Sequence, residues 1–322
     1  MRRSEMLSRL LVILGAALVL TVPLAVRFLA ARGVVEIHGR MAESGGWSPA
    51  FIQAQAGVPL QLRLTSDDVL HGFAIGQSEI PEVDVHPGKM TELTLTFDEP
   101  GTYTFYCTRW CGVNHWRMRG TIQVTGDAPS DPQPVSPPLY VTLGLDIDAP
   151  HPAPVTPAER PSAARGAALA SWLPSAYLTT DYYRSHSPAQ VYLDLRADPA
   201  SASLNDSDLW DLVAYIWQAN TTPDGLAEGQ RLYARNCAAC HGETGGGDGV
   251  FAASLEAQTG FFPADFSDPA AMLGASPALL QGKILRGGMG TGMPYWGPIF
   301  GNETIWGIIV YLYTFQFAEG GR

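Results

Sequence analysis

The stretch Cys107-Thr-Arg-Trp-Cys111-Gly-Val-Asn-His115-Trp-Arg-Met118 decides the fold of the region around it. Two thiols, an imidazole and a thioether follow directly after YTFYC, which has the alternating pattern of a strand. Soft sulfur ligands together with imidazole select copper, and the stretch has no carboxylate for a hard cation. His71, in VLHGF on an earlier predicted strand, is placed by the sequence to complete the ligand set.

Three other interpretations of these residues stay open from the pattern alone. Cys107 and Cys111 suit a disulfide in an oxidising compartment, and the C-x3-C-x3-H spacing also suits zinc. A mononuclear blue copper site needs only one cysteine. Met118 argues against zinc, a disulfide leaves His115 and Met118 without a role, and a single copper leaves the second cysteine unused.

Residues 33–126 read as an all-β domain around this stretch. Short alternating segments are separated by the turn signals HPGK and DEPGTY. The segments are QLRLTS, LHGFAI, TELTLTF, YTFYC and GTIQVTG. This pattern predicts a small antiparallel sandwich or barrel.

The pattern C-x3-C-x3-H-x2-M, with HGF upstream, resembles the CuA domain of cytochrome c oxidase subunit II over residues 34–125. The resemblance implies a cupredoxin sandwich that holds a binuclear copper centre, with one unpaired electron shared between its metals. It implies that both cysteines bridge the coppers. One copper would be completed by His71 and Met118, and the other by His115 and the backbone carbonyl of Arg109.

Two features depart from the commonest members of that family. Those members have a glutamate at the position of Arg109, and it helps to hold a magnesium ion, so the magnesium is in doubt here. They also have two membrane helices. This chain has one candidate helix, which is more similar to reduced variants of the family.

A second motif, Cys237-Ala-Ala-Cys240-His241, is the attachment pattern of a covalent c-type haem. It follows a helical segment, and NETIWGIIVYLYTF closes the chain as another helix. Residues 222–318 resemble small bacterial class I cytochromes c, which implies a cytochrome c domain over residues 222–322. The expected axial ligands of the iron are His241 and Met293, and Met289 is the rival to Met293.

Two segments lie between these domains. Residues 127–166 are rich in proline and are predicted to form an extended linker. Residues 167–221 have helical patterns but no CxxCH motif. They are predicted to be a haemless helical segment, either a degenerate cytochrome c or a single amphipathic helix that packs on the haem domain.

The N-terminus contains an uncharged apolar run from Leu10 to Val26, which is at the short end for a spanning helix. We expect a transmembrane anchor at residues 10–31. Basic residues within 1–9 place that end in the cytoplasm and the metal domains outside, by the positive-inside rule. A cleaved signal peptide is the alternative, and it exports the chain equally.

The net charge and the cysteine pattern restrict the classes of partner and the roles of the cysteines. The net charge of the 322 residues is −11, and the first 32 residues hold five arginines and one glutamate. The acidic remainder argues against a nucleic-acid partner and favours a basic protein. All four cysteines fall in two ligand-like pairs, so none is left for a structural disulfide.

The whole chain resembles subunit II of a haem-copper terminal oxidase with a cytochrome c fused at its C-terminus. This implies an electron-input subunit of an oxidoreductase, in which a reduced donor protein supplies haem c, then CuA, then a polytopic catalytic subunit I that reduces oxygen. Alternatives are the electron-input subunit of a CuA-containing nitric oxide reductase and a freestanding membrane-anchored carrier. We expect the haem domain to dock near Trp110, His115 and Trp116.

Overall fold

The computed structural model describes residues 33–112, 114–127, 136–288 and 290–317. The predicted cytoplasmic end (1–9), the predicted anchor (10–31) and Met289 lie outside the described residues. Within the described ranges, no helix is both long and apolar enough to cross a bilayer.

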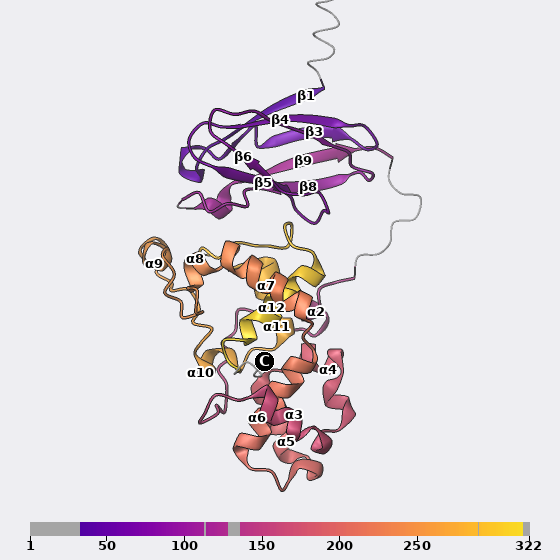
Figure 1. The fold of residues 1–322 in the computed structure, drawn as a ribbon, viewed down its shortest axis with the longest axis vertical. Coiled ribbons are helices and arrows are strands. Elements are labelled where there is room, and N and C mark those ends of the chain that lie inside the picture. Colours follow the sequence, from indigo (N-terminus) through magenta and orange to yellow (C-terminus); the bar gives the residue numbers. More distant parts are fainter. Residues whose placement is uncertain (1–32, 113, 128–135, 289, 318–322) are drawn as a thin grey trace, which may run out of the picture.

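A β-sandwich forms one end of the molecule and a helical region forms the other, in the predicted order (Figure 1). The strands are β1 (Val34–Gly39), β2 (Trp47–Ser48), β3 (Phe51–Gln55), β4 (Leu60–Ser66), β5 (His71–Ile75), β6 (Val83–Val85), β7 (Thr91–Leu95), β8 (Gly101–Tyr106) and β9 (Arg119–Thr125). Two short 3-10 helices, η1 (Ala42–Ser44) and η2 (His115–Arg117), interrupt the connections.

The predicted sandwich is confirmed, but its strands are not all antiparallel. One sheet has the order β2-β1-β4-β7 and the other has the order β3-β9-β8-β5-β6. The pairs β1–β4 and β3–β9 are parallel. The physical reason is that the chain passes through β3 of the other sheet between β2 and β4. The strands β1 and β4 are therefore not joined by a hairpin and can pair in parallel.

The copper-type stretch joins β8 to β9 at one end of this sandwich. Cys107 follows β8 directly, and Met118 precedes β9. The buried ring of Phe105 packs beneath this loop, against the rings of Trp47 and Phe73. A Cβ atom on Gly120 would lie 2.0 Å from the Phe105 ring, so glycine is required there.

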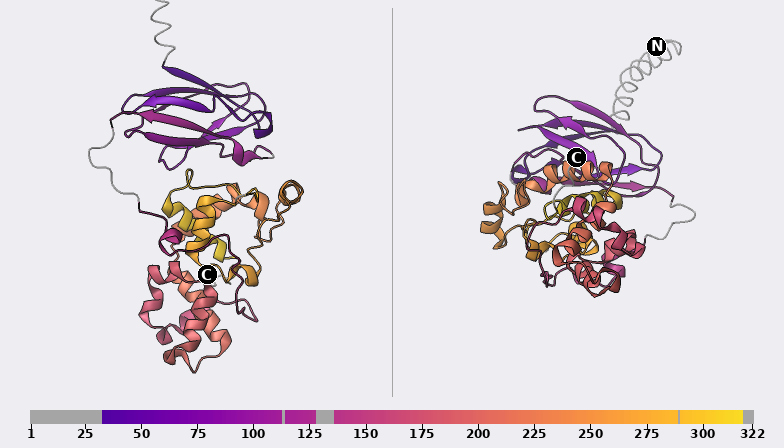
Figure 2. Two further views of the ribbon diagram at one scale, coloured as in Figure 1. Left: turned by 180° about the vertical axis from the view of Figure 1, so that it is seen from behind. Right: turned by 60° about the horizontal axis from the view of Figure 1, so that its bottom comes forward.

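The helical region contains two units that share one apolar core. Its α-helices are α2 (Leu139–Thr142), α3 (Ala163–Ala168), α4 (Thr180–Ser185), α5 (Pro188–Ala197), α6 (Asp206–Ala219), α7 (Pro223–Asn236), α8 (Ala238–His241), α9 (Ala252–Thr259), α10 (Pro269–Met272), α11 (Pro277–Arg286) and α12 (Asn302–Tyr313). Its 3-10 helices are η3 (Ala170–Trp172), η4 (Ser175–Leu178) and η5 (Pro199–Ser201). In Figures 1 and 2 the unit of α7–α12 lies between the sandwich and the unit of α3–α6.

Most of the predicted linker is not an extended spacer. From residue 136 onward it packs on the helical region, where Ile147 is buried and the N–H of Ala153 donates to the carbonyl of Ala270 at 2.8 Å. Asp148 forms an ion pair with Arg286. The prolines exclude long helices, but the apolar residues between them still bury against α11, and the pattern of prolines did not predict this.

The segment 167–221 is also more than the single helix considered above. It contains α4, α5 and α6 with short 3-10 helices between them, and its buried side chains extend the core of the neighbouring unit. The alternative of one amphipathic helix is therefore wrong.

Replacing Gly120 with alanine is expected to destabilise the sandwich by about 1–3 kcal/mol, because the new methyl group overpacks the ring of Phe105. Denaturant unfolding followed by tryptophan fluorescence measures this. Gly101→Ala in β8 is the matched control, since its Cβ would lie 3.6 Å from the nearest atom outside its neighbours. Equal stability of the two variants would show that the packing under the loop is loose.

Candidate copper and haem centres

The structure brings all six predicted copper ligands together in one place. The thiols of Cys107 and Cys111 are 3.9 Å apart, and the carbonyl oxygen of Arg109 lies 3.3 Å from the Cys107 sulfur. Each imidazole faces a different thiol of this pair. The remaining distances are 3.8 Å from His71 Nδ1 to Cys107 Sγ, 3.7 Å from His115 Nδ1 to Cys111 Sγ, and 3.3 Å from Met118 Sδ to Cys111 Sγ.

Three elements position these side chains. His71 opens β5 and is completely buried, and Cys107 follows β8, the neighbouring strand. The loop then turns back through left-handed backbone at Gly112 (φ 133°) and Asn114 (φ 58°), residue types that tolerate this conformation. This reversal places His115 in η2 on the same side as the thiols.

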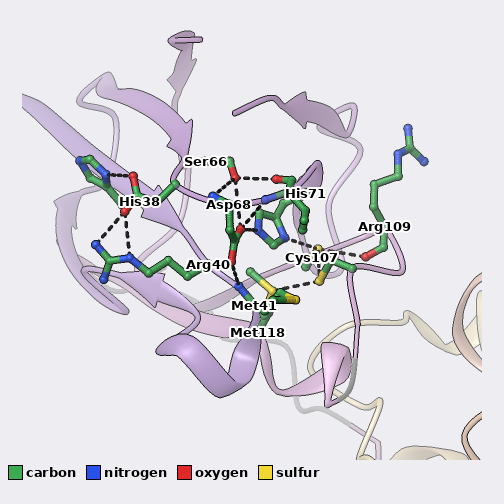
Figure 3. A network of polar contacts seen from close by, with 12 residues as sticks. His38, Arg40, Met41, Ser66, Asp68, His71, Cys107, Arg109 and Met118 are labelled. Carbon is green, nitrogen blue, oxygen red and sulfur yellow. Dashed lines mark hydrogen bonds and ion pairs between the residues drawn. The ribbon is translucent and has the colours of Figure 1, made fainter. Parts of the chain in front are cut away.

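Asp68, which the sequence analysis did not single out, orients His71. Its Oδ1 atom lies 2.8 Å from His71 Nε2, so Nδ1 is left to face the thiols (Figure 3). Burial opposes ionisation of Asp68, but hydrogen bonds from the N–H groups of Met41 and Val69 and the contact with His71 outweigh it and lower the carboxyl pKa. A carboxylate behind a ligating imidazole fixes the ring and raises its basicity. The sequence signal for this role was an acidic residue, Asp68, three positions before the candidate ligand His71.

The two thiols are strongly coupled. The hydrogen bond with Cys111 lowers the pKa of Cys107, helped by the neighbouring imidazoles, and the same contact with burial raises the pKa of Cys111. The second thiol and the imidazoles thus stabilise the thiolate form of Cys107 in a buried site. Thiolates are the form that binds metal, and the donor set of two sulfurs, two imidazoles, a thioether and a carbonyl suits copper.

The side chain of Arg109 pairs with two acidic residues of the sandwich. Its guanidinium lies 3.3 Å from Glu82 and 2.9 Å from Asp84. A fixed cation thus already neutralises these carboxylates. The geometry does not favour a magnesium ion beside Arg109.

The haem motif lies on the wall of one cavity of about 330 Å³. Cys237, Cys240, His241 and Met293 all line it, so the structure brings the predicted attachment and axial residues together. The wall is completed mainly by apolar residues, and these include Leu255, Phe261, Phe262, Pro263, Pro294 and Trp296.

These residues fit a haem by their chemistry as well as by their position. His241 Nδ1 lies 3.0 Å from the carbonyl of Ala264, which leaves Nε2 for the iron, and its ring stacks on Phe266 at 4.4 Å. Burial lowers the pKa of His241 and keeps the imidazole neutral. Burial raises the pKa of Cys237 to about 12 and that of Cys240 to about 11, so both remain thiols.

Trp116, the residue after His115, connects the two centres. It belongs to the sandwich, yet it lines the same cavity as the haem motif. Phe251 of the haem domain is only 3% exposed because it packs 5.0 Å from Trp116 and 6.4 Å from Trp110. The copper-type loop and the haem cavity are therefore in direct contact.

Polar contacts fix the two domains beside this apolar contact. Arg235 of α7 lies 2.8 Å from Glu82, which also pairs with Arg109. Gln77, in left-handed backbone at φ 55°, donates its N–H to the carbonyl of Ile299 at 2.9 Å. A Cβ atom on Gly76 would lie 2.3 Å from the carbonyl oxygen of Pro298, so the chains approach here as closely as only glycine allows.

Both parts of the predicted resemblance are confirmed by comparison with known families. Residues 51–125 match the family model of the periplasmic domain of cytochrome C oxidase subunit II. Residues 224–312 match that of cytochrome C oxidase, cbb3-type, subunit III. The chain therefore combines a subunit II-like copper domain with a cytochrome c domain of the cbb3 subunit III kind.

Individual relatives cover the copper domain. The chain is 37% identical over 84 residues to a protein called cytochrome c oxidase subunit 2 from Thermus thermophilus, across 26% of this chain and 62% of that protein. A second protein of that name, from a particular strain of the same species, gives the same identity over 49% of its length. The chain thus spans about half to three-fifths of the curated relatives it matches.

Two solved structures are also similar. The periplasmic domain of subunit II of cytochrome oxidase from Bradyrhizobium japonicum is 18% identical, with a TM-score of 0.26 over 29% of this chain and 84% of that one. A chain from a heme-copper terminal oxidase dimer is 24% identical, with a TM-score of 0.25 over 38% of this chain and all of that one.

Replacing Asp68 with asparagine is expected to weaken copper binding about 10–100-fold, because the imidazole of His71 loses its charged partner. Competition against a copper chelator measures the affinity. Asp67→Asn is the matched control, since Asp67 pairs with His38 and Arg40 at the surface. Equal affinities in the two variants would remove Asp68 from the site.

Proposed function

We propose that this chain is the electron-input subunit of a haem-copper terminal oxidase. It passes electrons from a reduced donor protein through haem c and a binuclear CuA centre to a catalytic subunit that reduces oxygen. The match of residues 51–125 to subunit II and of residues 224–312 to a cytochrome c supports this role. The proposal includes a single membrane anchor at residues 10–31, with both metal domains on the extracytoplasmic side.

The observation that carries the proposal is the position of Trp116. One chain holds a copper-type ligand set and a haem-type cavity, and this side chain adjoins the first and lines the second. Two sites for one-electron carriers in direct contact serve transfer between them. A carrier with two unrelated sites has no need for this arrangement.

The ligands have distinct proposed roles at the copper centre. Cys107 and Cys111 would hold both metals through their thiolates. His71 and Met118 would serve one copper, and His115 with the carbonyl of Arg109 would serve the other. When bound, the copper pair supplies one-electron exchange with little change in geometry. The protein holds its ligands in place through Asp68 behind His71 and through Trp47, whose indole N–H donates to the carbonyl of Met118 at 3.2 Å.

At the haem centre, Cys237 and Cys240 would form the thioether bonds, and His241 and Met293 would be the ligands of the iron. A methionine ligand favours the reduced iron and raises its potential. The neutral imidazole of His241, held by Ala264, is ready to bind without losing a proton. The apolar wall around them keeps water away from the metal.

Metal content tests the assignment directly. We expect two coppers and one covalent haem per chain, because each cysteine pair serves one centre. Elemental analysis of the purified protein should give copper to iron in the ratio of two to one, and Cys107→Ser should abolish the two-copper electronic spectrum. The haem absorption should survive in that variant and is its internal control. Zinc in place of copper, or a ratio of one to one, would refute the binuclear centre.

The order of reduction tests the direction of flow. Rapid mixing with a reduced donor is expected to show the haem band changing before the copper band, since Trp116 connects the haem cavity to the copper loop. The second step should not depend on protein concentration, because both sites lie in one chain. Copper reduced first would contradict the proposed direction.

A pair of variants tests the docked arrangement. Arg235→Gln removes the ion pair with Glu82 across the domains, whereas Arg231→Gln removes an ion pair with Glu228 inside α7. Only the first variant should slow haem-to-copper transfer, because only its ion pair joins the two domains. Surface ion pairs contribute about 0.2–1 kcal/mol, so the transfer should slow by at most about fivefold. An equal effect of both variants would show that the interdomain pair has no role in docking.

A further inference from the structure

The proposed function does not use residues 162–220. Three helices of this segment, α3, α5 and α6, correspond in order to α7, α11 and α12 of the haem domain. Helix α5 begins with Ser187 as N-cap and proline and alanine next, and α11 begins with Ser276 followed by the same two residue types. Both serines accept a hydrogen bond from the N–H three residues on. Both helices have 10 residues.

The closing helices of the two segments also correspond. When Asp206 of α6 is aligned with Asn302 of α12, tryptophan falls on tryptophan (Trp210 with Trp306) and tyrosine on tyrosine. The apolar positions coincide as well. The aligned stretches are DSDLWDLVAYIW and NETIWGIIVYLY.

The two segments also correspond in three dimensions, because α3 crosses α6 in the same way as α7 crosses α12. A Cβ atom on Gly166 of α3 would lie 2.0 Å from the carbonyl oxygen of Asp211 and 2.9 Å from Cβ of Tyr215. A Cβ atom on Gly229 of α7 would lie 2.1 Å and 3.1 Å from the same atoms of Gly307 and Tyr311. In the alignment Asp211 falls on Gly307 and Tyr215 on Tyr311, so both pairs of helices cross at the same residues.

The copy lacks the part that would hold a haem. Between the crossing glycine and the serine cap, the haem domain has 46 residues, which include CxxCH and its loop, and the copy has 20. The space is filled by side chains, since Tyr183 is 3% exposed and packs 5.4 Å from Trp217. The copy is therefore a solid helical unit without a cofactor.

The two units pack against each other around one pair of aligned residues. Trp217 of the copy contacts Tyr313 of the haem domain edge to face at 5.5 Å, and these residues are aligned with each other. Arg184, just before α5, lies 4.2 Å above the ring of Trp306. The carbonyl of Leu273, just before α11, accepts a hydrogen bond from the N–H of Ala189 in α5 at 2.9 Å.

We propose that residues 162–220 are a haem-free copy of the cytochrome unit and that they clamp the two helices on either side of the Met293 loop. That loop, described at 287–288 and 290–301, connects α11 to α12. The copy contacts both helices, α11 through α4 and α12 through Trp217. Arg160, just before the copy, donates to the carbonyls of Thr314 and Phe317 beyond the end of α12, at 2.6 and 2.9 Å. The clamp rests on the proposed haem-binding role of the neighbouring unit, whereas the duplication does not.

Hydrogen exchange on the intact wild-type protein tests the shared core. The amides of α5 and α6 should open together with those of α11 and α12 as one cooperative unit, because their buried side chains form one cluster. The clamp is overturned if α5 and α6 exchange at a clearly lower opening free energy. This result does not depend on a variant that folds, nor on the identity of the cofactor.

A variant tests the effect on the axial ligand. Trp217→Ala should lower the temperature at which the methionine–iron absorption band is lost by at least about 5 °C, together with the helical circular dichroism. Trp172→Ala, at a 44% exposed position of the same copy, is the matched control and should leave both transitions unchanged. The clamp would be overturned if Trp217→Ala lost the methionine–iron band at the same temperature as the wild type. A chain without covalent haem in a pyridine haemochrome assay would instead refute the proposed function.

Discussion

The pairing of β5 with β8 is the constraint on which the site depends. Its register sets Ala74 opposite Tyr106 and Ile75 opposite Phe105, so the start of β5 lies beside the end of β8. His71 thereby meets Cys107, although 35 residues separate them along the chain. A slip of one residue would turn the imidazole to the other face of the sheet. The loop that follows β8 then carries the remaining ligands and Trp116 toward the haem domain.

The local parts of this arrangement were predictable from the sequence, and the distant parts were not. Cys107 to Met118 lie in one loop, and CxxCH spans five consecutive residues, so residue type and spacing were enough to predict both candidate centres. Phe251 had no such signal, because nothing in its neighbourhood says that two tryptophans from another domain will cover it. The same holds for Glu82 with Arg235, since long-range pairs of charges leave no periodic pattern.

The contact between the domains changes how transfer between them is understood. A proline-rich tether alone would raise the effective concentration of the haem domain and leave it to search for the copper loop. Here residues 136–166 mostly pack on the helical region, and Phe251, Gln77 and Gly76 fix one orientation of the domains. The haem domain is therefore docked on the copper domain in the folded chain. In the proposed function, the rate of transfer would be set by this fixed geometry, without diffusion of the haem domain.

The haem-free copy addresses a weakness of small cytochrome domains. Part of the core of such a domain is the cofactor itself, so its side chains bury less apolar surface against one another. The copy replaced its cofactor space with Tyr183 and kept the helix crossing at Gly166. Its Trp217 then adds apolar contacts to α12 on the side away from copper. The haem domain is thus held on two opposite sides, by the sandwich and by the copy, while the axial loop lies between them.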